Sequence, residues 1–168
     1  MALVDYEFHK SKSFILSPHV NLHRMVRFME IGARGITMPT HRLMGIMTKI
    51  ADEPIGRVYP DGTVSKSVTE RDWTRLREGS SIAKEILIKA GAGGGSIVVS
   101  KPQGAHPGGT AAIGRVVNED LQTKVDGLFV CDASVLPAPI GMPPILTIVA
   151  LAKRLASKSS KSSKSSKP

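Results

Sequence analysis

Three short stretches in the last third of the chain carry residues that can do chemistry. His106 lies in a turn rich in proline and glycine, where an imidazole can exchange a proton near neutral pH. Asp132 follows a short apolar run, at a point where a carboxylate can accept hydrogen bonds from a ligand. Pro143 and Pro144 open an apolar helical run, and the amino end of a helix carries positive partial charge. These residue types suit a site that holds an anionic cofactor and moves a proton beside it.

The same three stretches resemble sequence blocks of the glucose–methanol–choline (GMC) family of oxidoreductases. Residues 106–114 are similar to the family's HPxGTxxMG block, with Ile113 in place of the usual methionine. Residues 126–137 resemble its GLxVxD[AG]S block, and residues 143–152 resemble its [NH]PxxTxxALA block, in the same order and at the same spacing. Before residue 100 the sequence is compatible with the antiparallel substrate-domain sheet that precedes these blocks in the family.

This resemblance implies a flavoprotein that oxidises a CH–OH group by hydride transfer to FAD. His106 corresponds to the active-site histidine of the family. The positions that match residues around the cofactor are Asp132, Ala133, Met142, Pro143, Pro144 and Ile145. The residues alone leave two alternatives open, namely a structural role for His106 and a turn-capping role for Asp132.

Two departures from the family pattern bear on this interpretation. Met142 stands where the family has a second active-site His or Asn, and methionine cannot take a proton. Either another group such as His41 fills that role, or the substrate and reaction differ from simple alcohol oxidation. A loop histidine is more often only a surface polar group. The chain also lacks a strand–GxGxxG–helix unit. We therefore expect the C-terminal portion of such an enzyme, which works with an N-terminal FAD-binding portion or a partner chain.

Composition limits the other classes of function. Net charge is +9, but four of the lysines lie after Ser157, and the four Phe, two Tyr and one Trp are scattered. We therefore expect no nucleic-acid site, since that needs clustered charge and aromatic platforms. Cys131 is the single cysteine, and the apolar run 145–152 is too short to cross a bilayer. We expect a cytoplasmic protein that binds neither a membrane nor a metal.

Apolar periodicity and turn residues predict the elements that position these residues. They predict strands over 2–8, 43–50, 96–100 and 127–132, helices over 22–32, 69–91 and 143–154, a loop over 32–42 and a hairpin over 57–65. We interpret the methionine-containing face of the first helix as core filling rather than a binding surface. Thr69 and Asp72 predict a capping box, and Gly79 interrupts the stripe of that helix. The last helix is apolar nearly all round, which predicts burial.

We therefore predict an α+β fold in three segments. Residues 1–103 form part of a substrate-binding domain with antiparallel strands, and residues 104–156 form the C-terminal α/β segment of an FAD domain. Residues 157–168 form a disordered Lys-Ser tail. The expected substrate is a small alcohol, and oligomerisation stays open. Rival interpretations are a non-catalytic remnant or interaction module with a basic tail, and an electrostatic binder that uses the Lys-Ser-Ser repeat.

Overall fold

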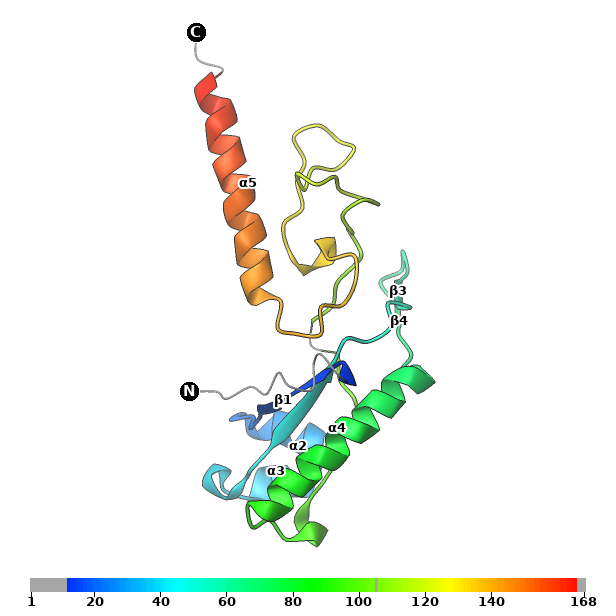
Figure 1. Cartoon of the computed structure of the whole chain (residues 1–168), viewed down its shortest axis with the longest axis vertical. Coiled ribbons are helices and arrows are strands. Elements are labelled where there is room, and N and C mark those ends of the chain that lie inside the picture. Colours follow the sequence, from blue (N-terminus) through cyan, green and yellow to red (C-terminus); the bar gives the residue numbers. More distant parts are fainter. Residues whose placement is uncertain (1–11, 105, 166–168) are drawn as a thin grey trace. The chain divides into compact units, whose positions relative to one another are not determined.

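The computed structural model describes residues 12–104 and 106–165, with side chains placed as far as Ser160. The chain divides into two compact units (Figure 1). Unit 1 is Met1–Asp52 with Val68–Gln103, and unit 2 is Glu53–Ser67 with Gly104–Pro168. The boundary between Gln103 and Gly104 coincides with the division between the first two predicted segments. Residues Glu53–Ser67, which contain the predicted hairpin, belong to unit 2 and not to the first segment. The predicted strand over 2–8 lies outside the described residues.

Unit 1 is built on a two-stranded antiparallel sheet. Its elements are β1 (Phe14–Pro18), α2 (Arg24–Ile31), α3 (Ala33–Thr37), η1 (Thr40–Arg42), β2 (Ile46–Ile50), α4 (Glu70–Lys89) and η2 (Gly94–Ser96). β1 pairs with β2 so that Phe14 lies opposite Ile50 and Leu16 lies opposite Thr48. The buried Phe14 and Leu16 pack with Ala83 of α4, which runs across this sheet (Figure 1). Helices combined with small antiparallel sheets confirm the α+β class.

The start of α4 confirms the predicted capping box. The Thr69 hydroxyl accepts a hydrogen bond from the Asp72 backbone N–H at 3.1 Å, and the Asp72 carboxylate accepts one from the Thr69 N–H at 3.2 Å. The helix ends at Lys89 with Ala90 as its C-cap, and Gly91 follows with a φ of +97°. A glycine takes this left-handed conformation without the strain that a side chain would add.

Gly79 lets α4 approach the sheet closely. A Cβ at this position would lie 2.3 Å from Thr48 Cγ2 and 3.3 Å from the ring of Phe14. The sequence marks this glycine as a break in the apolar stripe, but its physical role is to leave room for the strands. Glycine lowers the intrinsic helix propensity at this position, but it allows α4 to pack closer to the sheet.

The corner between α2 and α3 buries an arginine instead of the predicted apolar face. Arg27 is 4% exposed, and its Nε donates a hydrogen bond to the Gly35 carbonyl at 2.9 Å. Leu22 and Met29 are 81% and 74% exposed. The core-filling interpretation of this helix is therefore wrong, because a guanidinium with its hydrogen bonds satisfied occupies the inner position. The predicted loop over 32–42 contains α3 and η1.

Unit 2 contains a short hairpin, long connecting segments and one long helix. Its elements are β3 (Arg57–Val58), β4 (Val64–Ser65), η3 (Ala133–Val135) and α5 (Ile145–Ser165). β3 pairs antiparallel with β4, which confirms the predicted hairpin around Pro60-Asp61-Gly62. The core of the unit consists of Val117, Leu121 and Val135, against which Leu151 and Leu155 of α5 pack.

Two predicted strands do not form within the described residues. Residues 96–100 hold the end of η2 followed by irregular backbone, and residues 127–132 make one isolated bridge, between Phe129 and Gln122. The reason is that a strand needs a neighbour for its backbone hydrogen bonds, whereas β-propensity reports only the side chains.

The first half of α5 is mostly exposed, contrary to the predicted burial. Leu146 is 82% exposed and Ile145 is 65% exposed, while Leu151 and Leu155 on another side of the helix pack on the core. Within the described residues only one side of this helix finds a partner, so burial all round is wrong for this chain. No helix in the described part of the chain is long and apolar enough to cross a bilayer.

α5 also continues through Ser165, although we expected disorder from residue 157. Extending an existing helix adds a hydrogen bond for each residue fixed, so serine and lysine can propagate what an apolar segment starts. The Ser159 and Ser160 hydroxyls donate to the carbonyls of Leu155 and Ala156 at 3.1 and 2.8 Å. The prediction of disorder from residue 157 considered only apolar burial, and it is wrong as far as Ser165.

The contact at Gly79 gives the first prediction. In an exposed helix, Gly79→Ala would add about 1 kcal/mol of stability. Here we expect it to lower the free energy of unfolding by about 1–3 kcal/mol, because the new methyl group collides with the stiff Thr48 side chain. Chemical denaturation measures the change. In a Thr48→Ser background, which lacks Cγ2, the loss should shrink; a gain in both backgrounds would contradict the prediction.

Candidate active site

Unit 2 brings the three chemical stretches to one hollow of about 500 Å³. Its lining residues are His106, Pro107, Gly108, Thr110, Asp132, Ala133, Ser134, Pro144, Ile145 and Ile148. Of the residues predicted from the sequence, it collects His106, Asp132, Ala133, Pro144 and Ile145. All five of these residues belong to unit 2.

Backbone hydrogen bonds hold the His106 turn against η3. The N–H groups of Gly109 and Ala111 both donate to the Ser134 carbonyl at 3.0 Å. A Cβ at Gly108 would lie 2.9 Å from the carbonyl oxygen of Ala133, so a larger residue would push the two segments apart. His106 itself is exposed to solvent at the hollow. The turn is thus fixed by its backbone, and the imidazole stays accessible.

Asp132 begins η3 and caps it. Its carboxylate accepts a hydrogen bond from the Ser134 backbone N–H at 2.7 Å. Hydrogen bonds from the side chain and the backbone of Ser134 lower the pKa of Asp132, because they favour the charged form. The carboxylate is therefore ionised at neutral pH. The capping role left open by the sequence is present, and exposure of the side chain leaves further acceptor sites on its oxygens.

The amino end of α5 closes another side of the hollow. Pro144 is buried, and its carbonyl accepts a hydrogen bond from the Ile148 N–H at 2.9 Å. Ile145 and Ile148 add apolar surface. The hollow therefore combines an imidazole, an anionic acceptor, a helix end that favours negative charge and an apolar wall. Such a combination can orient a polar ligand against an apolar surface and move a proton beside it.

Three predicted site residues do not line this hollow. Met142 is half-buried and Pro143 is exposed, and neither belongs to the lining. His41 lies in η1 of unit 1 and is exposed, so its catalytic role stays a prediction. Sequence reasoning missed Ile148 as a lining residue, although its position one helical turn after Ile145 is a usable signal.

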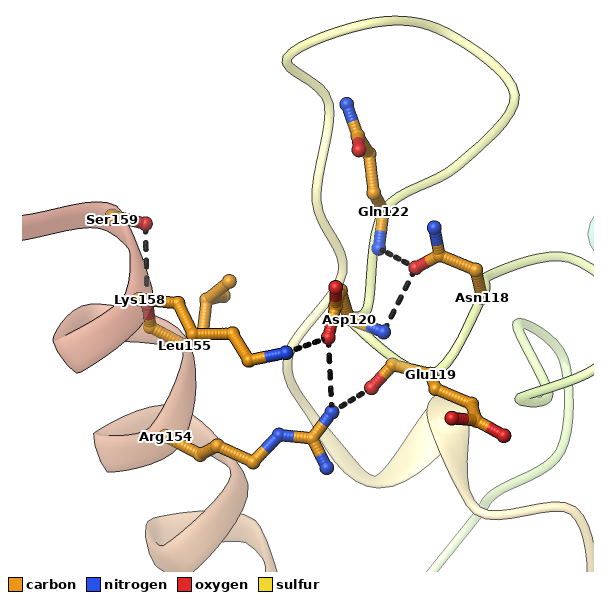
Figure 2. A network of polar contacts seen from close by, with 8 residues as sticks. All are labelled: Asn118, Glu119, Asp120, Gln122, Arg154, Leu155, Lys158 and Ser159. Atoms are coloured by element: carbon orange, nitrogen blue, oxygen red, sulfur yellow. Dashed lines mark hydrogen bonds and ion pairs between the residues drawn. The ribbon is translucent and has the colours of Figure 1, made fainter. Parts of the chain in front are cut away.

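A polar network attaches the far half of α5 to a turn of unit 2 (Figure 2). The Asn118 Oδ1 accepts hydrogen bonds from the backbone N–H groups of Asp120 and Gln122 at 2.9 and 3.0 Å. Asp120 forms ion pairs with Lys158 and, at 3.4 Å, with Arg154. Arg154 also donates to the carbonyl of Glu119, as Figure 2 shows. The network supplements the apolar contacts that hold the helix.

The charge of Asp120 depends on this network. The hydrogen bond from Lys158 is the main cause of a lowered pKa at Asp120, and the positive charges of Lys158 and Arg154 add to it. The same turn holds Leu121, which is 1% exposed and has a φ of +66°. A buried leucine with positive φ is strained, so its apolar packing must offset that strain.

Comparisons with known proteins show one matching family and two similar proteins. The profile of the family described as GMC oxidoreductase matches residues 56–152. An uncharacterized protein of Methanocaldococcus jannaschii is 34% identical over 147 residues, which are 88% of this chain and 37% of that protein. The Drosophila melanogaster protein named "Neither inactivation nor afterpotential protein G" is 53% identical over 53 residues, 31% of this chain and 9% of that protein. No solved structure matches the chain.

The pKa of Asp120 gives a prediction about α5. Because the pKa of Asp120 is lowered, its ion pairs with Arg154 and Lys158 stabilise the contact of α5 with the turn above about pH 4, the ordinary pKa range of aspartate. This stabilisation is lost as the pH falls through the lowered pKa. At pH 6, Asp120→Asn should speed hydrogen exchange of amides 151–158 by about 2- to 5-fold. At pH 2, the variant and the wild type should exchange alike.

Asp61→Asn is the matched control for this measurement. Asp61 is also an exposed carboxylate with a lowered pKa, caused by hydrogen bonds from Thr63, but it lies in the β3–β4 turn. Its substitution should leave the exchange of α5 unchanged. Equal effects of the two substitutions at pH 6 would mean that net charge, and not the network, governs the helix.

Proposed function

Because the chain belongs to the GMC oxidoreductase family, we propose that it is the C-terminal portion of an FAD-dependent enzyme that oxidises a CH–OH group. The observation that supports this most is the meeting of His106, Asp132 and the amino end of α5 at one hollow. The proposal treats this hollow as the place where substrate and flavin meet. Its cytoplasmic location is part of the same proposal.

The residues of the hollow fit the parts of a flavin. The ionised Asp132 carboxylate accepts hydrogen bonds, which suits the hydroxyl groups of the ribityl chain. The amino end of α5 favours negative charge, which suits the pyrimidine side of the ring. Gly108 leaves no side chain between the His106 turn and η3. When bound, FAD supplies the hydride acceptor.

His106 is the group in the hollow that can take the substrate proton. An imidazole titrates near physiological pH, so its neutral form is available as a general base. In the proposed reaction the hydroxyl proton of the alcohol passes to a ring nitrogen of His106 while the carbonyl forms. Met142 cannot share this task, because methionine neither takes a proton nor donates a strong hydrogen bond. His41 of unit 1 is our candidate for it.

The flavin needs residues that this chain does not supply. The sequence has no glycine-rich dinucleotide unit, and the chain spans 37% of the length of the archaeal relative. Leu146 and Val149 of α5, which are 82% and 46% exposed, leave apolar surface for a partner. We propose that an FAD-binding portion, as a partner chain or as the rest of a longer protein, completes the enzyme, and that this chain alone is inactive.

A non-catalytic interaction module is the second candidate function. The exposed apolar residues Leu22, Met25 and Met29 of unit 1 favour it, because Met25 and Met29 lie one turn apart on α2 and Leu22 lies just before this helix. A module of this kind would bind the same partner portion without holding a flavin. The cofactor content of the complex therefore separates the two functions.

The test of cofactor binding uses this chain together with the part of the archaeal relative that it does not match. We expect the purified complex to absorb at about 450 nm, as flavins do, and this chain alone to show no such band. After the complex is denatured and the protein is removed, the released cofactor should be FAD, at about one molecule per complex. A stable complex without flavin would support the interaction module and contradict the enzyme.

Substitution of His106 tests its role in the reaction. In the flavin-loaded complex, His106→Ala should lower the turnover of an alcohol by about 10²- to 10⁴-fold, because a general base contributes that much. Flavin content should stay unchanged. His23→Ala is the control, since His23 is an exposed histidine of unit 1 outside the hollow. If His106→Ala turned over substrate as fast as His23→Ala, His106 would have no part in the proton transfer.

A further inference from the structure

Unit 2 has a second hollow, of about 360 Å³, that the proposed reaction does not use. We call its lining the cationic face: Arg115, Val116, Thr123, Lys124, Val125 and Leu128. None of these residues lines the hollow of His106. The face therefore needs an explanation of its own.

A tight turn fixes the shape of the cationic face. The Thr123 N–H donates to the Leu128 carbonyl at 2.9 Å, and the Leu128 N–H donates to the Val125 carbonyl at 3.2 Å. The Val125 N–H also donates to the Thr123 hydroxyl at 3.0 Å. Because the turn is held by its own hydrogen bonds, a partner would order little of it on binding.

The apolar part of the cationic face stays open to water. Val116, Val125 and Leu128 are 45%, 62% and 50% exposed. A pocket for a small molecule encloses most of its ligand, whereas these walls are half uncovered. Exposed apolar side chains with a polar rim are typical of protein contact surfaces. The geometry thus favours a protein segment over an enclosed small ligand.

The two cations of the face lack an acidic partner in the described part of the chain. The carboxylate in their own turn, Asp126, accepts a hydrogen bond from the Gln122 side-chain amide at 2.9 Å and forms no ion pair with them. By contrast, Arg154 and Lys158 of the same unit share Asp120. Arg115 and Lys124 therefore present uncompensated positive charge beside apolar surface, which complements a segment with carboxylates next to apolar side chains.

We propose that the cationic face docks an acidic, apolar surface segment of the FAD-binding portion. This inference rests on the proposed function and adds where the partner binds. Carboxylates of that segment pair with Arg115 and Lys124, and its apolar side chains cover Val125 and Leu128. The face is separate from the His106 hollow, so a change here alters assembly without touching the reacting groups.

The test measures binding of this chain to the part of the archaeal relative that it does not match. The double variant Arg115→Glu with Lys124→Glu should raise the Kd by about 10- to 100-fold, since it places like charges across the contact. Val125→Ser should raise the Kd by about 2- to 10-fold, because it removes apolar surface from the contact. Salt at 0.5 M should weaken wild-type binding and narrow the gap to the charge variant.

The control variant is Lys84→Glu with Lys89→Glu. Both lysines are exposed on α4 of unit 1, so the change in net charge is identical. Circular dichroism should show the same folded content for all variants. If the control weakens binding as much as the Arg115 and Lys124 variant, or if neither weakens it, the docking face is wrong while the proposed enzyme stands. Absence of binding by the wild-type chain would instead contradict the proposed partner, and with it the proposed function.

Discussion

The small apolar core of unit 2 is the constraint on which the candidate site depends. Val117, Leu121 and Val135 are buried, and Leu151 and Leu155 close the cluster from α5. Val135 lies directly after the residues that receive the His106 turn, and the helix that supplies the leucines also supplies the wall of the hollow. The three chemical stretches are therefore held together by one cluster, and loss of packing there would move all of them at once.

Local signals in the sequence predicted much of the fold. The Thr69 cap, the hairpin around Asp61-Gly62 and the start of α5 each depend on a few adjacent residues, and each is present. The position of the strand at 127–132 could not follow from such signals, because pairing depends on a neighbour elsewhere. The prediction that α5 is buried was wrong for the same reason. An apolar helix gains stability from packing, but its own sequence does not show which residues pack against it.

The parts of the candidate site that depend on a few adjacent residues could be predicted from the sequence. His106 and Asp132 could be named because the turn and the acid are each recognisable, and their common hollow follows from backbone bonds between Ser134 and the His106 turn. Gly79 shows the limit of such reasoning. Its sequence context gives only a cost in helix propensity, whereas its role depends on Thr48, more than thirty residues earlier in the chain. Likewise, nothing local marks Arg27 as an interior residue.

The interleaving of the two units has a consequence for synthesis on the ribosome. Unit 1 needs α4, which leaves the exit tunnel only after the hairpin of unit 2, and unit 2 needs α5 at the very end of the described chain. Neither unit can therefore finish folding as an uninterrupted stretch while the chain emerges. Each unit therefore contains segments that must wait for residues synthesised later before they can pack, and their apolar surface stays exposed during that interval.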